Sequence, residues 1–454
     1  MSNYQASTTQ AWILGSITII QKHDQVKVVY GADTSFPTKT MLFAASIWSL
    51  GLISIRNRLS QPRERLSKAI SIFAPLNHSL HRIECRTPLA YKLLQVAALY
   101  GLASSGESRP SLRQGEWELM ERRQMGKHGL EVSTLCLGTM TFGFQIDRSS
   151  SFEILDKAFD HRLSFLDTSD VYPTGAGLKK VGVTEQIIGE WMKERGNRDA
   201  VLLATKCCGP TRHGLNNWGL SRQHIMEAVE NSLRRLGTDY IDLYQAHQPD
   251  QRVPIEESLR AFDDLVTQGK VRYIGCANYA TWQLSDAVKT AENLNFNGYI
   301  SVQPRYNLLY RDIEVELIPF CQNEGLGVIV YNPLAGGFLS GKYSLDSGLE
   351  ENTRFTLGTS SERYQERYWQ EEQFKAVATL KEVVDARNQS LVSVAIAWVV
   401  RQPGITSALI GASSAGQLDA SLAYTDVEFD EELISACEAV WWSLPRRPVA
   451  SGYM

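Results

Sequence analysis

The sequence lacks the signs of several special protein classes. Its seven cysteines are odd in number and form no CxxC pair, so we expect the reduced thiols of a cytoplasmic protein rather than a disulfide framework. Cys207 and Cys208 are adjacent, a spacing that does not suit two ligands of one zinc ion. The 15 prolines and 33 glycines among 454 residues are too few for a fibrous or low-complexity chain.

An excess of positive charge is also missing. The chain has 46 Lys and Arg residues against 50 Asp and Glu, a net charge of −4, which argues against nucleic acid as a partner. The charge is unevenly spread, since residues 1–119 have 13 basic and 7 acidic side chains whereas residues 120–454 have 33 and 43. Residues 1–119 therefore have a net positive charge and residues 120–454 a net negative charge, which indicates two differently composed parts of the chain.

Residues 1–119 contain one apolar run, at 41–55, with basic residues after it. As a helix this run would reach about 22 Å, short of the ~30 Å hydrocarbon core of a membrane. We expect residues 1–119 to be a poorly structured extension, disordered or loosely docked, with no catalytic role. Contact of residues 41–55 with a membrane is the less favoured alternative.

From residue 120 onward, short apolar runs alternate with amphipathic ones. Residues 121–125 and 131–133 flank a Gly-rich turn and predict a small hairpin. Eight strand-and-helix units follow, with strands at 133–139, 164–167, 201–206, 241–247, 273–278, 299–303, 327–331 and 407–411, and helices at 150–161, 184–195, 221–236, 255–268, 281–293, 313–324, near 370–387, at 392–401 and from about 415. Such units require a parallel sheet, and eight of them close into a (β/α)8 TIM barrel. We predict this α/β barrel domain at 120–454.

Polar side chains end the otherwise apolar strands. In strand order these residues are Asp167, Lys206, His247, Asn278, Gln303 and Tyr331, with Gly411 after the last strand. Because parallel strands end on one face of a barrel, where barrel enzymes have their sites, we expect these residues to converge. Each has a simpler structural explanation on its own, such as a buried ion pair, a helix cap or core packing.

Four residues together suit the reduction of a carbonyl group. Asp167 and Lys206 end neighbouring strands, and Tyr172 lies five residues past Asp167. A nearby ammonium favours the phenolate, so we expect Lys206 to lower the pKa of Tyr172 and make the phenol an acid. His247 can bind a carbonyl oxygen by a hydrogen bond. The sequence has neither a GxSxG nucleophile elbow nor an HxH metal pair, and we predict no metal.

No side chain supplies a hydride, so a nicotinamide cofactor is implied. The chain has no GxGxxG after a strand, which excludes the usual dinucleotide fold. Asn278 and Gln303 can instead bind the carboxamide, and Tyr331 can stack on the nicotinamide. The segment GASSAGQL at 411–418 opens a helix, whose backbone N–H groups and Ser413 can hold a phosphate.

With these motifs the stretch from about residue 120 to 422 resembles an aldo-keto reductase. The matching segments are LDTSDVYPTG, LLATKCCGP, SLRRLGTDYIDLYQAHQPD, QGKVRYIGCANY, SVQPRYNLLYR, VYNPLAGGFLSGKY and LIGASSAGQL. The resemblance implies a catalytic tetrad of Asp167, Tyr172, Lys206 and His247. It also implies that NADP(H) binds across the carboxyl end of the barrel. Asn278, Gln303 and Tyr331 would bind the nicotinamide. The pyrophosphate and adenosine end of the cofactor would be bound by Leu334, Gly336, Gly411, Ser413 and Gln417.

Three departures from the family pattern concern the cofactor. Ala277 stands where Ser is frequent, Asn332 stands where Ser is usual, and Ala420 and Ser421 replace Glu and Asn. The loss of one carboxamide hydrogen bond at Ala277 would weaken cofactor binding by about 1 kcal/mol. No Lys or Arg lies within 411–422 to bind the additional phosphate of NADP(H). The sequence therefore predicts NADP(H) as the cofactor but leaves NAD(H) as an alternative.

The expected partner is a small-molecule carbonyl substrate. Phe142, Trp218 and Tyr306 are predicted at its pocket, although each is equally suited to packing. The sequence does not indicate the individual substrate or the oligomeric state. Two alternatives remain open: a nucleotide-sensing regulatory subunit with slow or vestigial catalysis, and an enzyme tethered to a membrane through residues 41–55.

Overall fold

The computed structural model describes residues 9–14, 17–22, 25–30, 120–346 and 348–445. The chain divides into two compact units, Met1–Leu112 and Arg113–Met454. In the first unit the described residues form an antiparallel sheet in the order β1 (Thr9–Leu14), β2 (Ile17–Lys22), β3 (Gln25–Tyr30). No strand was predicted in this part of the chain, although Ile and Val are typical of strands. The apolar run at 41–55 lies outside the described residues.

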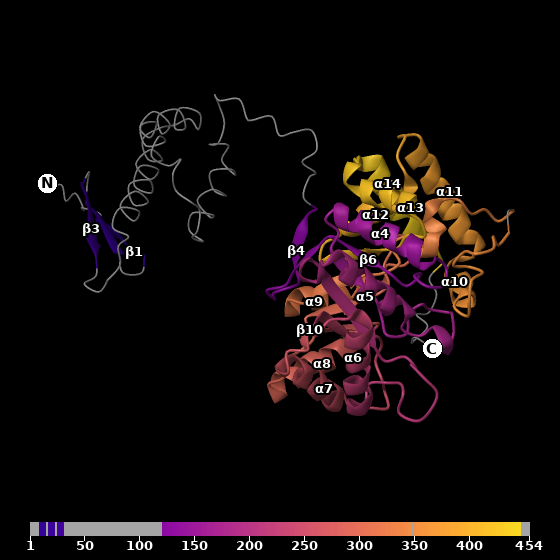
Figure 1. The fold of residues 1–454 in the computed structure, drawn as a ribbon. Helices are drawn as coiled ribbons and strands as arrows, with labels where there is room; N and C mark the ends of the chain where they lie inside the picture. The colour runs from indigo at the N-terminus through magenta and orange to yellow at the C-terminus, as the bar shows by residue number, and fades with distance from the viewer. Residues whose placement is uncertain (1–8, 15–16, 23–24, 31–119, 347, 446–454) are drawn as a thin grey trace, which may run out of the picture. The chain divides into compact units, whose positions relative to one another are not determined.

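The second unit is built on a closed barrel of eight parallel strands that pair in chain order (Figure 1). The strands are β6 (Leu135–Gly138), β7 (Phe165–Asp167), β8 (Leu202–Cys207), β9 (Ile241–Ala246), β10 (Val271–Ala277), β11 (Ser301–Gln303), β12 (Gly327–Val330) and β13 (Ser407–Ile410). Pairing of β13 with β6 closes the ring. The predicted (β/α)8 barrel is confirmed.

Helices surround the barrel as the amphipathic pattern predicts. They are α4 (Arg148–Asp160), α5 (Val183–Arg195), α6 (Arg222–Leu236), α7 (Ile255–Thr267), α8 (Thr281–Leu294), α9 (Leu317–Glu324), α11 (Glu371–Asp385), α12 (Leu391–Val400) and α13 (Ala415–Leu422). Ser221 caps α6, because its side chain accepts a 3.3 Å hydrogen bond from the backbone N–H of His224. Within the described part of the chain, no helix combines the length and apolar character that crossing a membrane requires.

Two helices were not predicted. α10 (Ser361–Tyr368) lies between the predicted strand at 327–331 and the predicted helix near 370–387, and α14 (Glu431–Ser443) follows the last predicted helix. α10 is mostly polar, and its buried side chains are Tyr364 and Tyr368, so its apolar face is too narrow to identify from periodicity. α14 packs against α11 (Figure 1).

The predicted hairpin is formed by β4 (Arg122–Gln124) and β5 (Glu131–Ser133), and it covers the amino-terminal end of the barrel. Met125 in its turn is fully buried, and a Cβ atom at Gly327, the first residue of β12, would collide with its sulfur. The backbone N–H of Lys127 also donates a 2.8 Å hydrogen bond to the carbonyl of Gly325. The hairpin thus closes the end of the barrel opposite the strand ends that carry the polar residues.

The barrel interior is apolar at one end and polar at the other. Phe165, Ala204 and Leu243 belong to its apolar layer. Side chains two positions further along a strand point to the same side. The inward residues of the next layer are therefore Asp167 and Lys206, in register with Ala204 and Gln245 respectively. This period of two delivers charged groups into the carboxyl end of the barrel.

Candidate active site

The predicted tetrad comes from three neighbouring strands. Asp167 ends β7, Lys206 is the next-to-last residue of β8, His247 directly follows β9, and Tyr172 lies in the loop after β7. A cavity of about 710 Å³ opens at this end of the barrel, and Asp167, Tyr172 and His247 line it. Lys206 is fully buried. The structure therefore brings all four residues to one end of the barrel.

Asp167 and Lys206 form a buried ion pair. The Lys206 ammonium donates to Oδ1 of Asp167 and, at 2.9 Å, to the carbonyl oxygen of Thr168. The two side chains are 2% and 0% exposed, respectively. Two charges removed from water need this contact, since either one alone would be strongly destabilising.

Two glutamines complete the surroundings of the carboxylate. Gln245 and Gln303 donate hydrogen bonds of 3.1 and 2.9 Å to Oδ2 of Asp167. Gln303 also approaches Oε1 of Gln245 at 3.3 Å. Both carboxylate oxygens therefore have donors, as a buried charge requires. Gln245 was missed in the sequence because it lies inside a strand and only the pleat shows that it faces Asp167.

The surroundings of Lys206 and Tyr172 decide their protonation. Burial has the largest effect on Lys206 and would lower its pKa, but Asp167 and Tyr172 together raise the pKa above its ordinary value. The Lys206 nitrogen lies 5.2 Å from the centroid of the Tyr172 ring. Burial raises the pKa of Tyr172 above its ordinary value, and the opposing effect of Lys206 is smaller. The expected net lowering of the Tyr172 pKa was therefore wrong: the phenol holds its proton at neutral pH, beside an ammonium that stabilises the phenolate.

His247 is neutral at physiological pH. Burial, with Lys206 as the second cause, lowers the pKa of His247 to about 3. Its ring lies edge-on to that of Tyr172, with centroids 5.8 Å apart at 77°. Its Nδ1 atom lies 3.1 Å from the hydroxyl oxygen of Ser169. A neutral imidazole beside the phenol can donate or accept a hydrogen bond at the cavity.

All residues predicted at the cofactor line this same cavity. They are Asn278, Gln303, Tyr331, Leu334, Gly336, Gly411, Ser413 and Gln417. They come from segments that follow β10, β12 and β13, together with the end of β11. The structure thus gathers these residues around one cavity, while the role of each stays a prediction.

Two asparagines leave amide atoms unpaired. Oδ1 of Asn278 and Nδ2 of Asn332 are buried and have no hydrogen-bond partner among the described residues. Both residues have left-handed backbones, with φ of 66° and 64°, which Asn tolerates better than most residues. Buried polar atoms without partners are rare and call for an explanation. One free acceptor and one free donor at the cavity fit a carboxamide ligand.

Other predicted cofactor contacts are partly used within the protein. The amide nitrogen of Gln303 donates to Asp167, which leaves the oxygen for a ligand. The backbone N–H and hydroxyl of Ser413 each donate a 2.9 Å hydrogen bond to Oε1 of Gln417. A phosphate at α13 would have to replace Gln417 as the acceptor of these hydrogen bonds.

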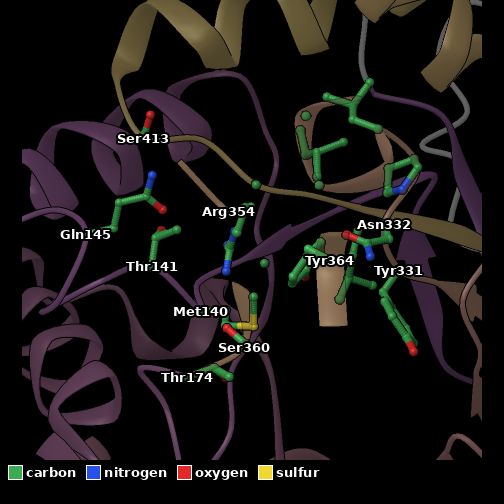
Figure 2. A pocket seen from close by; sticks show the side chains of 18 of the residues that line it. Met140, Thr141, Gln145, Thr174, Tyr331, Asn332, Arg354, Ser360, Tyr364 and Ser413 are labelled. Atoms are coloured by element: carbon green, nitrogen blue, oxygen red, sulfur yellow. The ribbon is translucent and has the colours of Figure 1, made fainter. Parts of the chain in front are cut away.

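Four basic residues that we did not predict line the cavity. They are Lys342, Arg354, Arg363 and Arg367, from the segment between β12 and α11. Figure 2 shows Arg354 in the middle of the cavity view. The ring of Tyr364 and the Cβ atom of Arg354 both lie close to Gly336. The basic residues were visible in the sequence, but their position over the barrel depends on the path of a long loop.

The predicted substrate residues lie elsewhere. Among the described residues that line the cavity, Phe142, Trp218 and Tyr306 are not found. Phe142 is fully buried in the core, and Tyr306 is buried, stacks on Trp398 and donates its hydroxyl to Glu314. Trp218 is 46% exposed and lies under the guanidinium of Arg252 at 3.3 Å. The side chains of Phe142 and Tyr306 are thus used in core packing, whereas Trp218 contacts Arg252.

The site is suited to proton transfer. It offers a protonated phenol, an ammonium paired with a carboxylate, and a neutral imidazole around one cavity. In the part of the chain that the structure describes, no group of three His, Cys, Asp or Glu residues could hold a metal ion. The six described cysteines are free and buried.

Comparison with known proteins gives one family. The profile of the Aldo/keto reductase family matches residues 134–441, a stretch that spans the barrel strands and includes all four tetrad residues.

Three curated relatives match over most of their length. A Bacillus subtilis protein named uncharacterized oxidoreductase YrpG is 38% identical, over 69% of this chain and 94% of its own. A probable voltage-gated potassium channel subunit beta of Arabidopsis thaliana is 34% identical, over 72% and 99%. A putative aryl-alcohol dehydrogenase of Schizosaccharomyces pombe is 32% identical, over 71% and 95%.

Proposed function

The chain belongs to the aldo/keto reductase family, and from this premise we propose that it reduces aldehyde or ketone carbonyls to alcohols with NADP(H). The observation that supports the proposal is the buried Tyr172, which lines the cavity and whose ring centroid lies 5.2 Å from the Lys206 nitrogen. A bound nicotinamide cofactor supplies a hydride to the carbonyl carbon. The chain itself has to bind the carbonyl, exclude water and deliver one proton.

Tyr172 is the proposed acid. Its raised pKa keeps the proton on the phenol until the carbonyl oxygen gains negative charge. Lys206 then stabilises the phenolate, and Asp167 holds Lys206 in position through the buried ion pair. Neutral His247 orients the carbonyl by a hydrogen bond. Oxidation of an alcohol uses the same groups in reverse.

The charge of the cavity supports NADP(H) over NAD(H). Four basic side chains line the cavity, and the one acidic residue among its described lining, Asp167, is already paired with Lys206. A ligand with several phosphates matches this excess of positive charge. The additional phosphate of NADP(H) would use more of it, with Lys342 and Arg354 as the proposed contacts.

Absorbance measurements test the proposal. Protein, NADPH and a panel of aliphatic and aromatic carbonyls should give a loss of the reduced-nicotinamide absorbance. Tyr172→Phe removes the acidic proton with little change in volume, so we expect turnover to fall by about 10²–10⁴-fold while NADPH still binds. Full turnover in this variant would contradict the assignment of Tyr172.

A second function is a nucleotide-sensing regulatory subunit with slow catalysis. It is favoured by the relative named as a probable voltage-gated potassium channel subunit beta, which the chain covers almost completely. Rapid multiple turnover supports the reductase. A single slow turnover with tight NADP(H) binding supports the subunit.

The remaining proposals concern the partner, the cellular location and residues 1–119. We propose a small-molecule carbonyl as the partner, without nucleic acid, and a cytoplasmic location that agrees with the free cysteines of the described residues. We also propose that residues 1–119 are an extension without a catalytic role. A chain that begins at Met120 should then retain kcat, whereas a large loss would contradict this division.

A further inference from the structure

Helix α10 contributes side chains to the cavity that the proposed reaction leaves unused. They are Arg363, Tyr364 and Arg367, together with Ser360 at the N-cap of the helix. Positions that are three, four and seven residues apart lie on one face of a helix. One face of α10 is therefore turned toward the cavity, and Figure 2 shows Ser360 and Tyr364 among the side chains around it.

The sequence of α10 separates its charges. It contains the triplet Glu-Arg-Tyr twice, at 362–364 and at 366–368. Because the two copies are four residues apart, each residue type forms a row along the helix. Both arginines line the cavity, whereas both glutamates are exposed and do not belong to its described lining. The helix therefore directs its positive charge toward the cavity and leaves its negative charge at the surface.

Arg363 has no acidic partner among the described residues. Glu366 lies three positions further along α10, a spacing at which ion pairs form, but the two side chains are not paired. Arg363 and Arg367 are four positions apart, and like charges at this spacing destabilise a helix. The one acidic side chain in the described lining, Asp167, is already paired with Lys206. An anion that binds both arginines would offset their repulsion.

The beginning of α10 lies against the loop that contains Tyr172. A Cβ atom on Gly175, three residues after Tyr172, would lie 3.3 Å from the hydroxyl oxygen of Ser360. In Figure 2, Ser360 is well apart from Ser413, which is predicted to hold a phosphate of the cofactor. The beginning of α10 is therefore on the Tyr172 side of the cavity, where the carbonyl group of a substrate would react.

Tyr364 adds a fixed aromatic ring beside the two arginines. It is 8% exposed, and its ring packs edge-on against Phe355 with centroids 6.2 Å apart. The ring also leaves no room for a Cβ atom at Gly336. The Tyr364 side chain is thus held in place by its neighbours, and at the cavity it offers an apolar surface for the body of a substrate.

We propose that the cavity face of α10 binds an anionic group of the substrate, so that the protein prefers carbonyl compounds that carry a carboxylate. Arg363 and Arg367 bind the carboxylate, because guanidinium groups form paired hydrogen bonds with its two oxygens. Lys342 and Arg354 stay with the additional phosphate of the cofactor. The inference rests on the proposed carbonyl reduction, whose substrate class it narrows.

Two substrates that differ in charge but hardly in shape test this inference. They are 4-carboxybenzaldehyde and its amide, 4-formylbenzamide. We expect kcat/KM of the wild-type protein to be at least about tenfold higher for the acid, since two arginines contribute. This preference should fall as salt is added, because salt screens exposed charges. Equal kcat/KM values in a protein that reduces both compounds would overturn the inference, while the proposed function would stand.

Substitution of the arginines locates the preference. Arg363 is exposed, so Arg363→Gln should fold normally and reduce the preference for the acid about three- to fivefold. Its kcat/KM for the amide and its Kd for NADPH should not change. Arg260→Gln is the matched control, because Arg260 is an arginine of α7 with a 57% exposed side chain. An equal loss of preference in Arg260→Gln, or weaker NADPH binding in Arg363→Gln, would overturn the inference.

A binding measurement decides the inference without turnover. The reduced product 4-(hydroxymethyl)benzoate cannot react with NADPH, so calorimetric titration of the protein–NADPH complex gives its Kd. We expect this Kd to rise about three- to fivefold in Arg363→Gln, and that of 4-(hydroxymethyl)benzamide to stay constant. An unchanged Kd for the benzoate in Arg363→Gln combined with Arg367→Gln would overturn the inference. If the wild-type protein reduces no carbonyl, the proposed function fails, and this titration still shows whether α10 binds a carboxylate.

Discussion

The side-chain amide of Gln303 donates a 2.9 Å hydrogen bond to Oδ2 of Asp167. Gln303 also lines the cavity, so one residue contacts both the proposed cofactor site and the carboxylate that holds Lys206. Gln245 donates to the same oxygen at 3.1 Å, but it is not among the described residues that line the cavity. The two glutamines therefore allow support of Asp167 to be separated from contact with a ligand.

Gln245→Leu should reduce kcat without weakening cofactor binding. Loss of one donor to a buried carboxylate costs about 1–3 kcal/mol, and we expect kcat to fall about tenfold as Asp167 and Lys206 lose their alignment. Gln303→Leu should lower kcat and also raise the Kd for NADPH. Steady-state kinetics and fluorescence titration with NADPH measure both effects. Equal weakening of NADPH binding by the two variants would show that the glutamines cannot be separated in this way.

The rate of carbonyl reduction should be insensitive to pH near neutrality. His247 has a pKa lowered to about 3, so it stays neutral. The pKa of Tyr172 is raised, so the acid keeps its proton through neutral pH and loses it only in strongly basic solution. Reduction should thus stay level from about pH 6 to at least about pH 10, the ordinary pKa of tyrosine, whereas alcohol oxidation, which needs the phenolate, should rise with pH.

The pH profile of kcat under saturating NADPH checks this prediction. A steep fall in the reduction rate as the pH is lowered through about 6.5 would contradict it, because His247 would then be taking up a proton at the ordinary pKa of histidine.

Lys206→Met should strongly destabilise the barrel. The substitution leaves the buried Asp167 carboxylate without its cation, and removal of one partner of a buried pair costs about 3–5 kcal/mol. Lys206→Met combined with Asp167→Asn removes both charges and should recover part of this loss. Urea unfolding at neutral pH measures both variants. A double variant no more stable than the single one would mean that the packing of Lys206, rather than its charge, supports the fold.

Arg354→Ala should change the preference between cofactors. Arg354 lines the cavity close to Gly336, and an arginine bound to phosphate contributes about 1.5–3 kcal/mol. We expect the Kd for NADPH to rise at least about tenfold and the Kd for NADH to change much less. Lys289→Ala is the control for net charge, since Lys289 is an exposed residue of α8 paired with Glu292.

Equal losses for the two cofactors would contradict a contact between Arg354 and the additional phosphate. Tyr172→Phe, which keeps all the basic residues, should retain the wild-type preference for NADPH.

Much of the fold could be predicted because its signals are local. The alternation of apolar strands and amphipathic helices lies within short windows, and parallel strands then have one closed arrangement. Asp167, Lys206 and His247 could be placed at one end of the barrel because each lies within one residue of the carboxyl end of a strand. Helix α10 was missed because its buried side chains are too few to produce a periodic signal.

Other features depended on which groups lie around a side chain. Whether the pKa of Tyr172 is raised or lowered depends on the balance between burial and the opposing charge of Lys206. The extent of burial cannot be read from the sequence of one strand, because segments far apart in the chain cover the side chain. Phe142 and Tyr306 were expected at the substrate, but both are buried in the core. The sequence shows that residue 354 is an arginine, but the path of its loop decides that this side chain lines the cavity.

The sequence by itself determined the closed barrel and the end of it at which the tetrad meets, because strand period and strand order are properties of the chain's local pattern. Only the tertiary structure decided the hydrogen-bond partners: Gln245 and Gln303 share Oδ2 of Asp167, and Ser169 faces Nδ1 of His247. Hydrogen bonds and pKa values depend on distances of a few ångströms between segments far apart in the chain, and such distances exist only after the barrel has closed.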